Sequence, residues 1–259
     1  MKAFADGCYM EAPCLDNPYK AASLPFRVAN EAVMREDIIG ADSAGFDAAV
    51  HVIGDKAHRL LLDLYEAVVA ANPVCERRFR LIHSWIPAEK ELDRAARMGT
   101  IKDFTPHHLI REISSLDMRL GPQRARTAVA WHTMIDQSLR FNTVSDWPGS
   151  SDHGHLAPRN LFGNMAYALP RQYDGKPAGG WRPEDAITSE EAIRAYAINP
   201  AYSSHEEDLK GSITEGKLAD VVVLSHDIPK RPRDQLPETR GLCTIIDGRT
   251  VYSHSEAIH

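Results

Sequence analysis

Residues 47–68, DAAVHVIGDKAHRLLLDLYEAV, join a short apolar run to an amphipathic helical pattern. The apolar run carries His51, and a Gly-Asp pair separates it from the helix. This order predicts a buried strand over 46–53 and a helix over 55–71, with a turn that Gly54 permits. A strand that leads directly into a helix is typical of a parallel sheet with crossover helices.

The alternation of strand and helix continues on both sides of this stretch. Further strands are predicted at 79–85, 99–104 and 139–147, with a helix near 87–97 after the first of them. The opening residues, MKAFADG, are a fifth strand candidate. Repeated strand and helix segments of this kind predict an α/β fold whose strands run parallel.

Past residue 150 the pattern changes to loops rich in glycine and proline, followed by one helix and two strands. Thr188 is expected to cap the helix, because Glu191 lies three residues on and completes a capping box. The strands are predicted at 218–227 and 242–253. An Asp-Gly pair in the second run suits a two-residue hairpin turn, so a small β subdomain is expected here.

The composition of the 259-residue chain favours a globular protein with small-molecule partners. It is 43% hydrophobic, so it can bury a sizeable core, and its net charge of -6 offers no basic surface to nucleic acid. No basic amphipathic helix suggests a membrane surface, and no apolar run is long enough to span a bilayer. We therefore expect a soluble, cytoplasmic protein. Its four cysteines are too far apart for a CxxC site and are expected to be reduced.

Three side chains that suit metal chemistry lie at or near the ends of different predicted strands. They are His51, His83 and Asp146, and the carboxyl ends of barrel strands are where active sites are built. Two imidazoles and a carboxylate suit a divalent metal such as zinc, which can lower the pKa of a bound water to about 7. Asp146 could also take the proton from that water and pass it to a leaving group.

Simpler interpretations stay open for these residues. A histidine at a strand end is often a hydrogen-bonded structural residue, and an aspartate such as Asp146 or Asp55 often caps a turn or a helix. His107 and His108 follow the third predicted strand. They could lie at the same carboxyl ends of the strands, with His108 as a substrate-binding side chain, or they could belong to an ordinary loop. The run of aspartate and histidine at 152–155 fits a solvated loop better.

Four segments, MKAFADG, AAVHVIGDKA, RFRLIHSW and TVSDWP, also carry a family likeness. In that order they resemble the Lys-x-Phe-x-Asp-Gly, His-x-Ile-Gly-Asp-x-Ala, Arg-x-Arg-Ile-Glu-His and Gly-Ser-Asp-x-Pro elements of the amidohydrolase superfamily. The subgroup is that of YtcJ-like proteins and N-substituted formamide deformylases, amidohydrolase family 3. A fifth segment, residues 199–227, is similar to the one that leads into the family's small β domain.

The resemblance implies a distorted (β/α)8 TIM barrel that holds one or two divalent metals, usually zinc. It also implies hydrolysis of an amide or other C–N bond of a small molecule by metal-activated water. Matched residue by residue, His51 is the ligand of the fifth barrel strand, His83 that of the sixth, and Asp146 the catalytic carboxylate and ligand of the eighth. Lys2 matches the fourth-strand lysine, which in such proteins can be carboxylated and bridge two metals.

The match covers about the C-terminal half of a full-length member, and the family's first-strand His-x-His pair has no counterpart here. Residues 1–205 are therefore expected to form a partial hydrolase barrel of about strands 4 to 8, and residues 206–259 the small β subdomain. Two departures concern the site. Ile82 stands where the family commonly has Glu, which alters the surroundings of His83, and Val144 stands where Gly is usual.

Two functions follow as hypotheses. One is a metal-dependent amidohydrolase, active alone or with a chain that supplies the missing strands. The alternative is a truncated, non-catalytic half that acts in binding or assembly. An open half-barrel exposes strand edges and apolar helix faces, and association would cover both. A homo-oligomer or a complex with a complementing chain is therefore expected.

Overall fold

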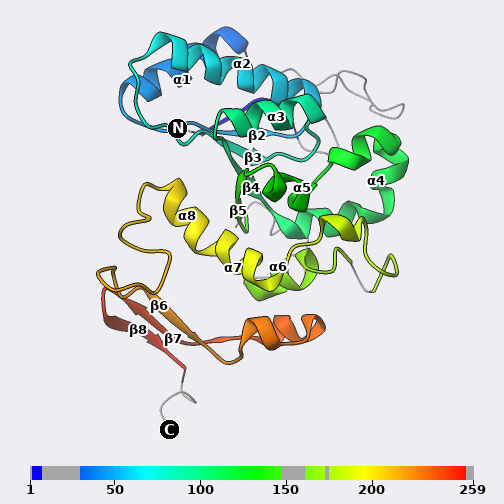
Figure 1. Cartoon of the computed structure of the whole chain (residues 1–259), viewed down its shortest axis with the longest axis vertical. Helices are drawn as coiled ribbons and strands as arrows, with labels where there is room; N and C mark the ends of the chain where they lie inside the picture. Colours follow the sequence, from blue (N-terminus) through cyan, green and yellow to red (C-terminus); the bar gives the residue numbers. More distant parts are fainter. Residues whose placement is uncertain (1, 8–29, 147–160, 173–174, 255–259) are drawn as a thin grey trace. The chain divides into compact units, whose positions relative to one another are not determined.

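The computed structural model describes residues 2–7, 30–146, 161–172 and 175–254 (Figure 1). The chain divides into two compact units. Unit 1 comprises Met1–Phe104 and Glu112–Phe141, and unit 2 comprises Thr105–Arg111 and Asn142–His259. The domain boundary predicted after residue 205 stays a prediction.

Unit 1 is built on a five-stranded sheet with the strand order β1-β2-β3-β4-β5. The strands are β1 (Lys2–Phe4), β2 (Ala49–Val52), β3 (Arg80–His83), β4 (Ile101–Phe104) and β5 (Arg140–Thr143), the last of which ends in unit 2. Strands β1 to β4 pair in parallel. Parallel pairing places the carboxyl ends of these strands at one edge of the sheet, the edge where open α/β sheets bind ligands.

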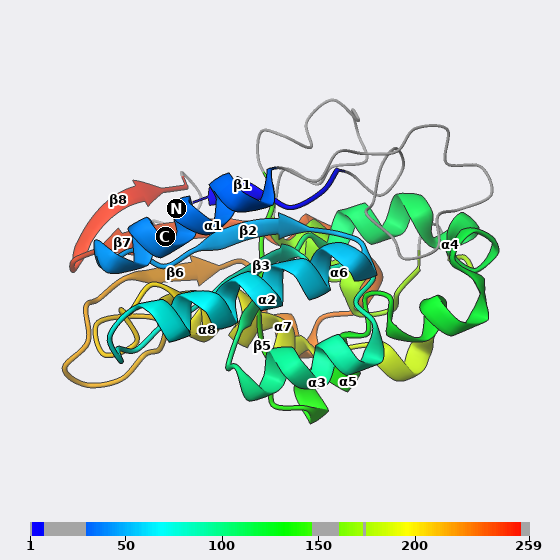
Figure 2. The same cartoon turned by 90° about the horizontal axis from the view of Figure 1, so that it is seen from above.

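Three helices of unit 1 lie together on one face of this sheet, as Figures 1 and 2 show. They are α1 (Glu31–Ser43), α2 (Asp55–Ala71) and α3 (Glu89–Arg97), and α2 contacts both of the others as well as β2. The apolar stripe of α2, which includes Leu61, Leu62 and Val68, is fully buried. Burial of this stripe accounts for the helical periodicity seen in the sequence.

Two more helices, α4 (Pro106–Thr127) and α5 (Trp131–Asp136), connect β4 to β5. Helix α4 is interrupted at Gly121, whose φ of 72° and ψ of 165° lie outside the helical region. Glycine adopts this conformation without a Cβ clash, and Pro122 then starts a new helical turn.

Unit 2 contains short helices and a three-stranded antiparallel sheet with the order β6-β7-β8. Its helices are α6 (Leu161–Ala168), η2 (Pro183–Asp185), α7 (Ser189–Tyr196), α8 (Ile198–Ser203), η3 (Ile228–Lys230) and η4 (Arg233–Glu238). Its strands are β6 (Val221–Leu224), β7 (Gly241–Ile246) and β8 (Arg249–Ser253).

Local sequence signals account for two features of unit 2. Helix α7 begins with the predicted capping box, in which Glu191 N donates to Thr188 Oγ1 at 3.2 Å and Thr188 N donates to Glu191 Oε2 at 2.7 Å. The turn between β7 and β8 is formed by Asp247 and Gly248, with φ values of 49° and 72°. Two consecutive positive φ values are those of the hairpin turn that an Asp-Gly pair favours.

The predicted α/β fold is confirmed for the described residues. Each of the strands predicted in 1–147 contains one observed strand, and the helix predicted at 55–71 has the bounds of α2. No helix in the described part of the chain is both long and apolar enough to cross a membrane.

Candidate metal centre

His51, the third residue of β2, is largely buried in unit 1, at 8% exposed. Its Nε2 lies 3.2 Å from the carbonyl oxygen of Gly7 and 3.9 Å from Oδ1 of Asp6. A carbonyl oxygen can only accept a hydrogen bond, so Nε2 carries the proton in the neutral ring. Nδ1 is then the His51 nitrogen with a lone pair.

Asp6 fixes the turn that follows β2. Its Oδ1 accepts a hydrogen bond from Ile53 N at 2.9 Å, and its Oδ2 accepts one from Gly54 N at 2.8 Å. Gly54 is the N-cap of α2, and no side chain caps this helix. Asp55 is the first residue of α2 and not its N-cap, but its Oδ1 does accept a hydrogen bond from a backbone N–H of the first turn, that of Lys56 at 2.8 Å. The other oxygen of the Asp55 carboxylate pairs with Arg124, whose Nε lies 3.2 Å from Oδ2.

His83 ends β3 and lies against His51. The two imidazole rings meet edge to face with centroids 4.7 Å apart, and His83 is 5% exposed. The backbone φ is 69° at His83 and 44° at Ser84. Non-glycine residues in this left-handed region cost of order 1–3 kcal/mol each and cluster at functional sites. Unit 1 therefore brings two of the predicted ligands together at a strained turn.

Three further polar side chains of unit 1 are linked next to this turn. Ser84 Oγ lies 3.0 Å from Lys102 Nζ and 2.9 Å from His58 Nε2, and all three residues are at most 1% exposed. Burial lowers the pKa of Lys102 to about 7. Burial, together with repulsion from Lys102, lowers the pKa of His58 to about 3. Both side chains can therefore be neutral inside the folded protein near pH 7.

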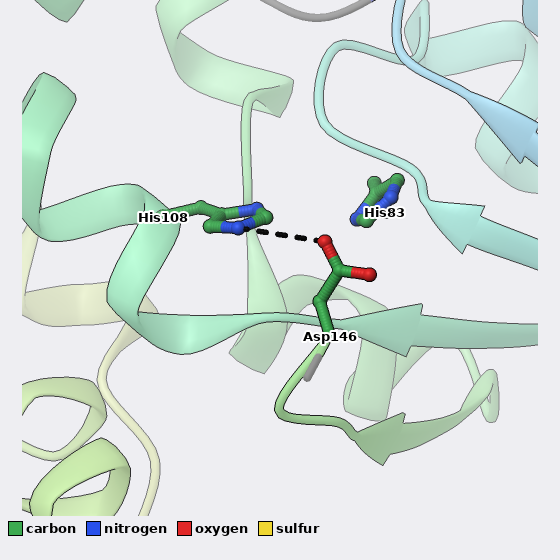
Figure 3. A group of neighbouring side chains, drawn as sticks. All are labelled: His83, His108 and Asp146. Atoms are coloured by element: carbon green, nitrogen blue, oxygen red, sulfur yellow. Dashed lines mark ion pairs between the residues drawn. The ribbon is translucent and has the colours of Figure 1, made fainter. Parts of the chain in front are cut away.

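Unit 2 contains a pair of candidate ligands, His108 and Asp146 (Figure 3). His108 lies in the first turn of α4, which Pro106 opens, and Asp146 follows the end of β5 by three residues. His108 Nε2 lies 3.8 Å from Asp146 Oδ2, and both side chains are partly exposed. Asp146 also has a left-handed backbone, with φ of 51°. The pair shows that the segments after β4 and β5 meet.

A set of donors that could hold a metal ion is present among the described residues: His83, His108 and Asp146, drawn in Figure 3. Two imidazole nitrogens and a carboxylate oxygen are ligand types of Zn²⁺ and of other divalent transition metals, so the donor chemistry fits a metal-dependent enzyme. The set contains the predicted ligands His83 and Asp146. It adds His108, which the sequence had suggested for substrate binding.

Two predicted ligands stand outside this set. The ring of His51 contacts the ring of His83, but His51 is not part of the ligand set. Lys2 is exposed, with Nζ 5.3 Å from the centroid of the Phe4 ring. The run at 152–155 lies outside the described residues.

The sequence interpretation missed Asp6, His58, Ser84 and Lys102. One signal could have found Lys102, because it is one of two adjacent charged residues in the strand-like run IKDF. Ser84 directly follows a proposed ligand, and His58 lies on the helix that follows His51. The roles of both residues depend on contacts between segments far apart in sequence.

A comparison with known families identifies the family of the chain. A model of the amidohydrolase family matches residues 1–252. The chain belongs to the amidohydrolase family. This confirms the resemblance that the four sequence elements carry.

Two relatives illustrate the extent of the match. This amidohydrolase chain is 29% identical to YtcJ of Bacillus subtilis over 262 aligned positions, which cover 98% of the chain and 47% of YtcJ. It is 27% identical to the N-substituted formamide deformylase of Arthrobacter pascens, with 98% of the chain and 46% of that enzyme covered. The chain thus spans about half the length of these relatives.

Solved structures with a similar fold are also found. An uncharacterized metal-dependent hydrolase from Pyrococcus horikoshii OT3 matches 90% of this amidohydrolase chain with a TM-score of 0.76 and 21% identity. The match covers 45% of that hydrolase. At this level of identity the likeness supports the fold alone.

Proposed function

We propose that the chain carries out metal-dependent hydrolysis of an amide or other C–N bond in a small molecule. The observation that supports this is the placement of His83, His108 and Asp146. They end or follow three neighbouring strands of one sheet, β3, β4 and β5, and together they supply a metal-ligand set. Membership of the amidohydrolase family makes hydrolysis the matching chemistry.

Each side chain has a role in this proposal. A bound divalent cation, proposed to be zinc, would supply a water of lowered pKa. His83 and His108 would hold the cation through ring nitrogens, and Asp146 would hold it through a carboxylate oxygen. Asp146 also accepts the proton of the attacking water and delivers it to the leaving nitrogen. His51 and Lys2 are proposed as further ligands where a second ion is bound.

The proposal extends to the architecture and the partners. We assign the five-stranded sheet to about strands 4 to 8 of a TIM barrel, and we expect a second copy or a complementing chain to cover the open parts. Exposed apolar side chains in the three-stranded sheet support an association: Val222, Val223, Ile246, Val251 and Tyr252 are each about half exposed. The cytoplasm is proposed as the location from composition alone.

The test combines metal analysis with activity. The purified chain is supplemented with Zn²⁺, Mn²⁺ or Fe²⁺, freed of excess metal, and assayed against amides, N-formyl compounds, dipeptides and esters. We expect bound metal and a turnover that a chelator abolishes and the metal restores. His83→Ala and His108→Ala should lose both.

The matched control is His132→Ala. His132 forms an exposed ion pair with Asp136, at 3.4 Å, and does not belong to the proposed ligand set. Metal bound equally by all variants would contradict the proposed ligands. Bound metal without turnover on any substrate would favour the non-catalytic alternative.

A further inference from the structure

The hydrogen bonds among Lys102, Ser84 and His58 run in one direction. His58 Nδ1 lies 2.7 Å from the carbonyl oxygen of Gly54, which can only accept, so Nδ1 carries the proton. In the neutral ring, Nε2 is then an acceptor, and Ser84 must donate its hydroxyl proton to it at 2.9 Å. The Ser84 oxygen accepts from Lys102 Nζ at 3.0 Å. The order is thus Lys102 to Ser84 to His58 to Gly54.

This hydrogen-bond chain connects the two turns that carry the histidines of unit 1. Gly54 belongs to the turn after β2, the strand of His51, and Ser84 directly follows His83. Ser84 and His83 both have positive φ values, so their backbone needs support from outside the turn. The contacts of Ser84 Oγ supply such support, because they tie the strained turn to α2 and to β4.

Lys102 occupies a position that favours an apolar residue. Its register partner on β3 is Leu81, which in turn pairs with Val50 on β2, and all three are 0% exposed. Among the described residues, Ser84 Oγ is the hydrogen-bonding partner found for Lys102 Nζ, and burial is the cause of its lowered pKa. Burying an amine here costs stability that a methionine would not cost. The lysine therefore requires an explanation other than packing.

We propose that Lys102 is a positioning residue, which sets the orientation of the His83 imidazole by holding Ser84 in its left-handed conformation. The inference rests on the proposed function, in which His83 is a metal ligand. Lys102 does not touch the metal or the substrate. It acts through Ser84, and His58 couples the same support to the turn that follows His51.

The test compares Lys102→Met and Ser84→Ala with the control Tyr65→Phe in the full chain. Tyr65 is also buried, and its hydroxyl donates to the carbonyl oxygen of Arg80 at 2.9 Å, at the opposite end of β3. The control thus removes a buried hydrogen bond from the same strand and leaves the turn intact. Circular dichroism first establishes which variants fold.

Two measurements follow. In metal-free protein, NMR of the imidazole ¹H and ¹⁵N nuclei reports the environment of His83. In protein titrated with Co²⁺, visible absorption reports affinity and ligand geometry. We expect both test variants to shift the His83 signals and to weaken Co²⁺ binding by about 10-fold to 100-fold. Tyr65→Phe should leave both unchanged. Lys102→Gln, which keeps an N–H donor, should return the His83 signals towards those of the wild type.

The outcomes distinguish a failure of the positioning role of Lys102 from a failure of the proposed function. His83 signals and Co²⁺ affinity that stay at the wild-type values in Lys102→Met and Ser84→Ala overturn the positioning role. If Lys102→Met does not fold, Ser84→Ala decides by the same criteria. A wild-type chain that binds no Co²⁺ contradicts the proposed function, and the metal-free NMR comparison still decides whether Lys102 orients His83.

Discussion

The carboxylate of Asp6 lies 2.8 Å from the backbone nitrogen of Gly54, and this contact joins the end of β1 to the start of α2. The second carboxylate oxygen accepts from Ile53 N at 2.9 Å. Asp6 is 1% exposed, so water cannot replace these bonds. One side chain thus satisfies two consecutive backbone donors directly after the strand that carries His51.

Replacing Asp6 by alanine is expected to destabilise the protein strongly. Two buried N–H groups would lose their acceptor, and each unsatisfied group costs about 1–3 kcal/mol, so the free energy of unfolding should fall by about 3 kcal/mol. Urea denaturation at pH 7 measures the change. The control is Asp63→Ala, which removes an exposed ion pair with Arg94 and should cost less than about 1 kcal/mol. Equal losses in the two variants would argue against the role of Asp6.

Lys102 should make the protein more stable as the pH rises above 7. Its pKa is about 7 in the folded state and 10.5 in the reference state. Between these values the unfolded chain binds a proton that the folded chain does not, so the free energy of unfolding gains up to about 1.4 kcal/mol per pH unit. This contribution is lost as the pH falls to 7. The free energy of unfolding of Lys102→Met, measured by urea denaturation from pH 7 to 10, should not show this increase with pH. The same pH dependence in the wild type and the variant would contradict the prediction.

His58 should have a similar effect at acid pH. Its pKa falls from 6.5 to about 3 on folding, so its contribution to stability is complete above pH 6.5 and is lost as the pH falls towards 3. Over this window the slope is again up to about 1.4 kcal/mol per pH unit. Thermal or urea unfolding of His58→Asn should depend less on pH between 6 and 4.5 than unfolding of the wild type. A variant as acid-sensitive as the wild type would show that His58 is charged when folded.

Asp146→Asn should separate catalysis from folding. The amide keeps the shape of the side chain but cannot take a proton from water, so we expect turnover to fall by about 10²-fold to 10⁴-fold with little change in stability. The substrate is whichever compound of the panel the wild type hydrolyses. Asp136→Asn removes another His–Asp pair, on the exposed face of α5, and should retain full activity. Unchanged turnover in Asp146→Asn would exclude this residue as the proton carrier.

Sequence patterns predicted the fold where a single local signal decides the structure. The helix at 55–71 has a long apolar stripe, the Thr188–Glu191 box is complete within four residues, and an Asp-Gly pair formed the expected hairpin turn. The strand ends indicated that His51 and His83 would lie near one another, because both are at or near the carboxyl ends of parallel strands. The contact of their rings confirms this.

Contacts between distant segments could not be predicted in the same way. The Asp6 carboxylate reaches a turn 47 positions further along the chain, and the Asp55 carboxylate pairs with Arg124 across 69 positions. Sequence spacing contains no information about such distances. The left-handed backbone at His83 and Asp146 also lacks a glycine signal, because only the surrounding structure imposes it.

The buried amine of Lys102 also provides a chemical probe of breathing motions in unit 1. The amine is 0% exposed, so it is shielded from any dissolved acylating reagent while the sheet is closed. Its modification rate would therefore report how often β4 separates from its neighbours. Peptide mass spectrometry of the chain after timed acylation would read this opening rate at a single site, without an introduced label.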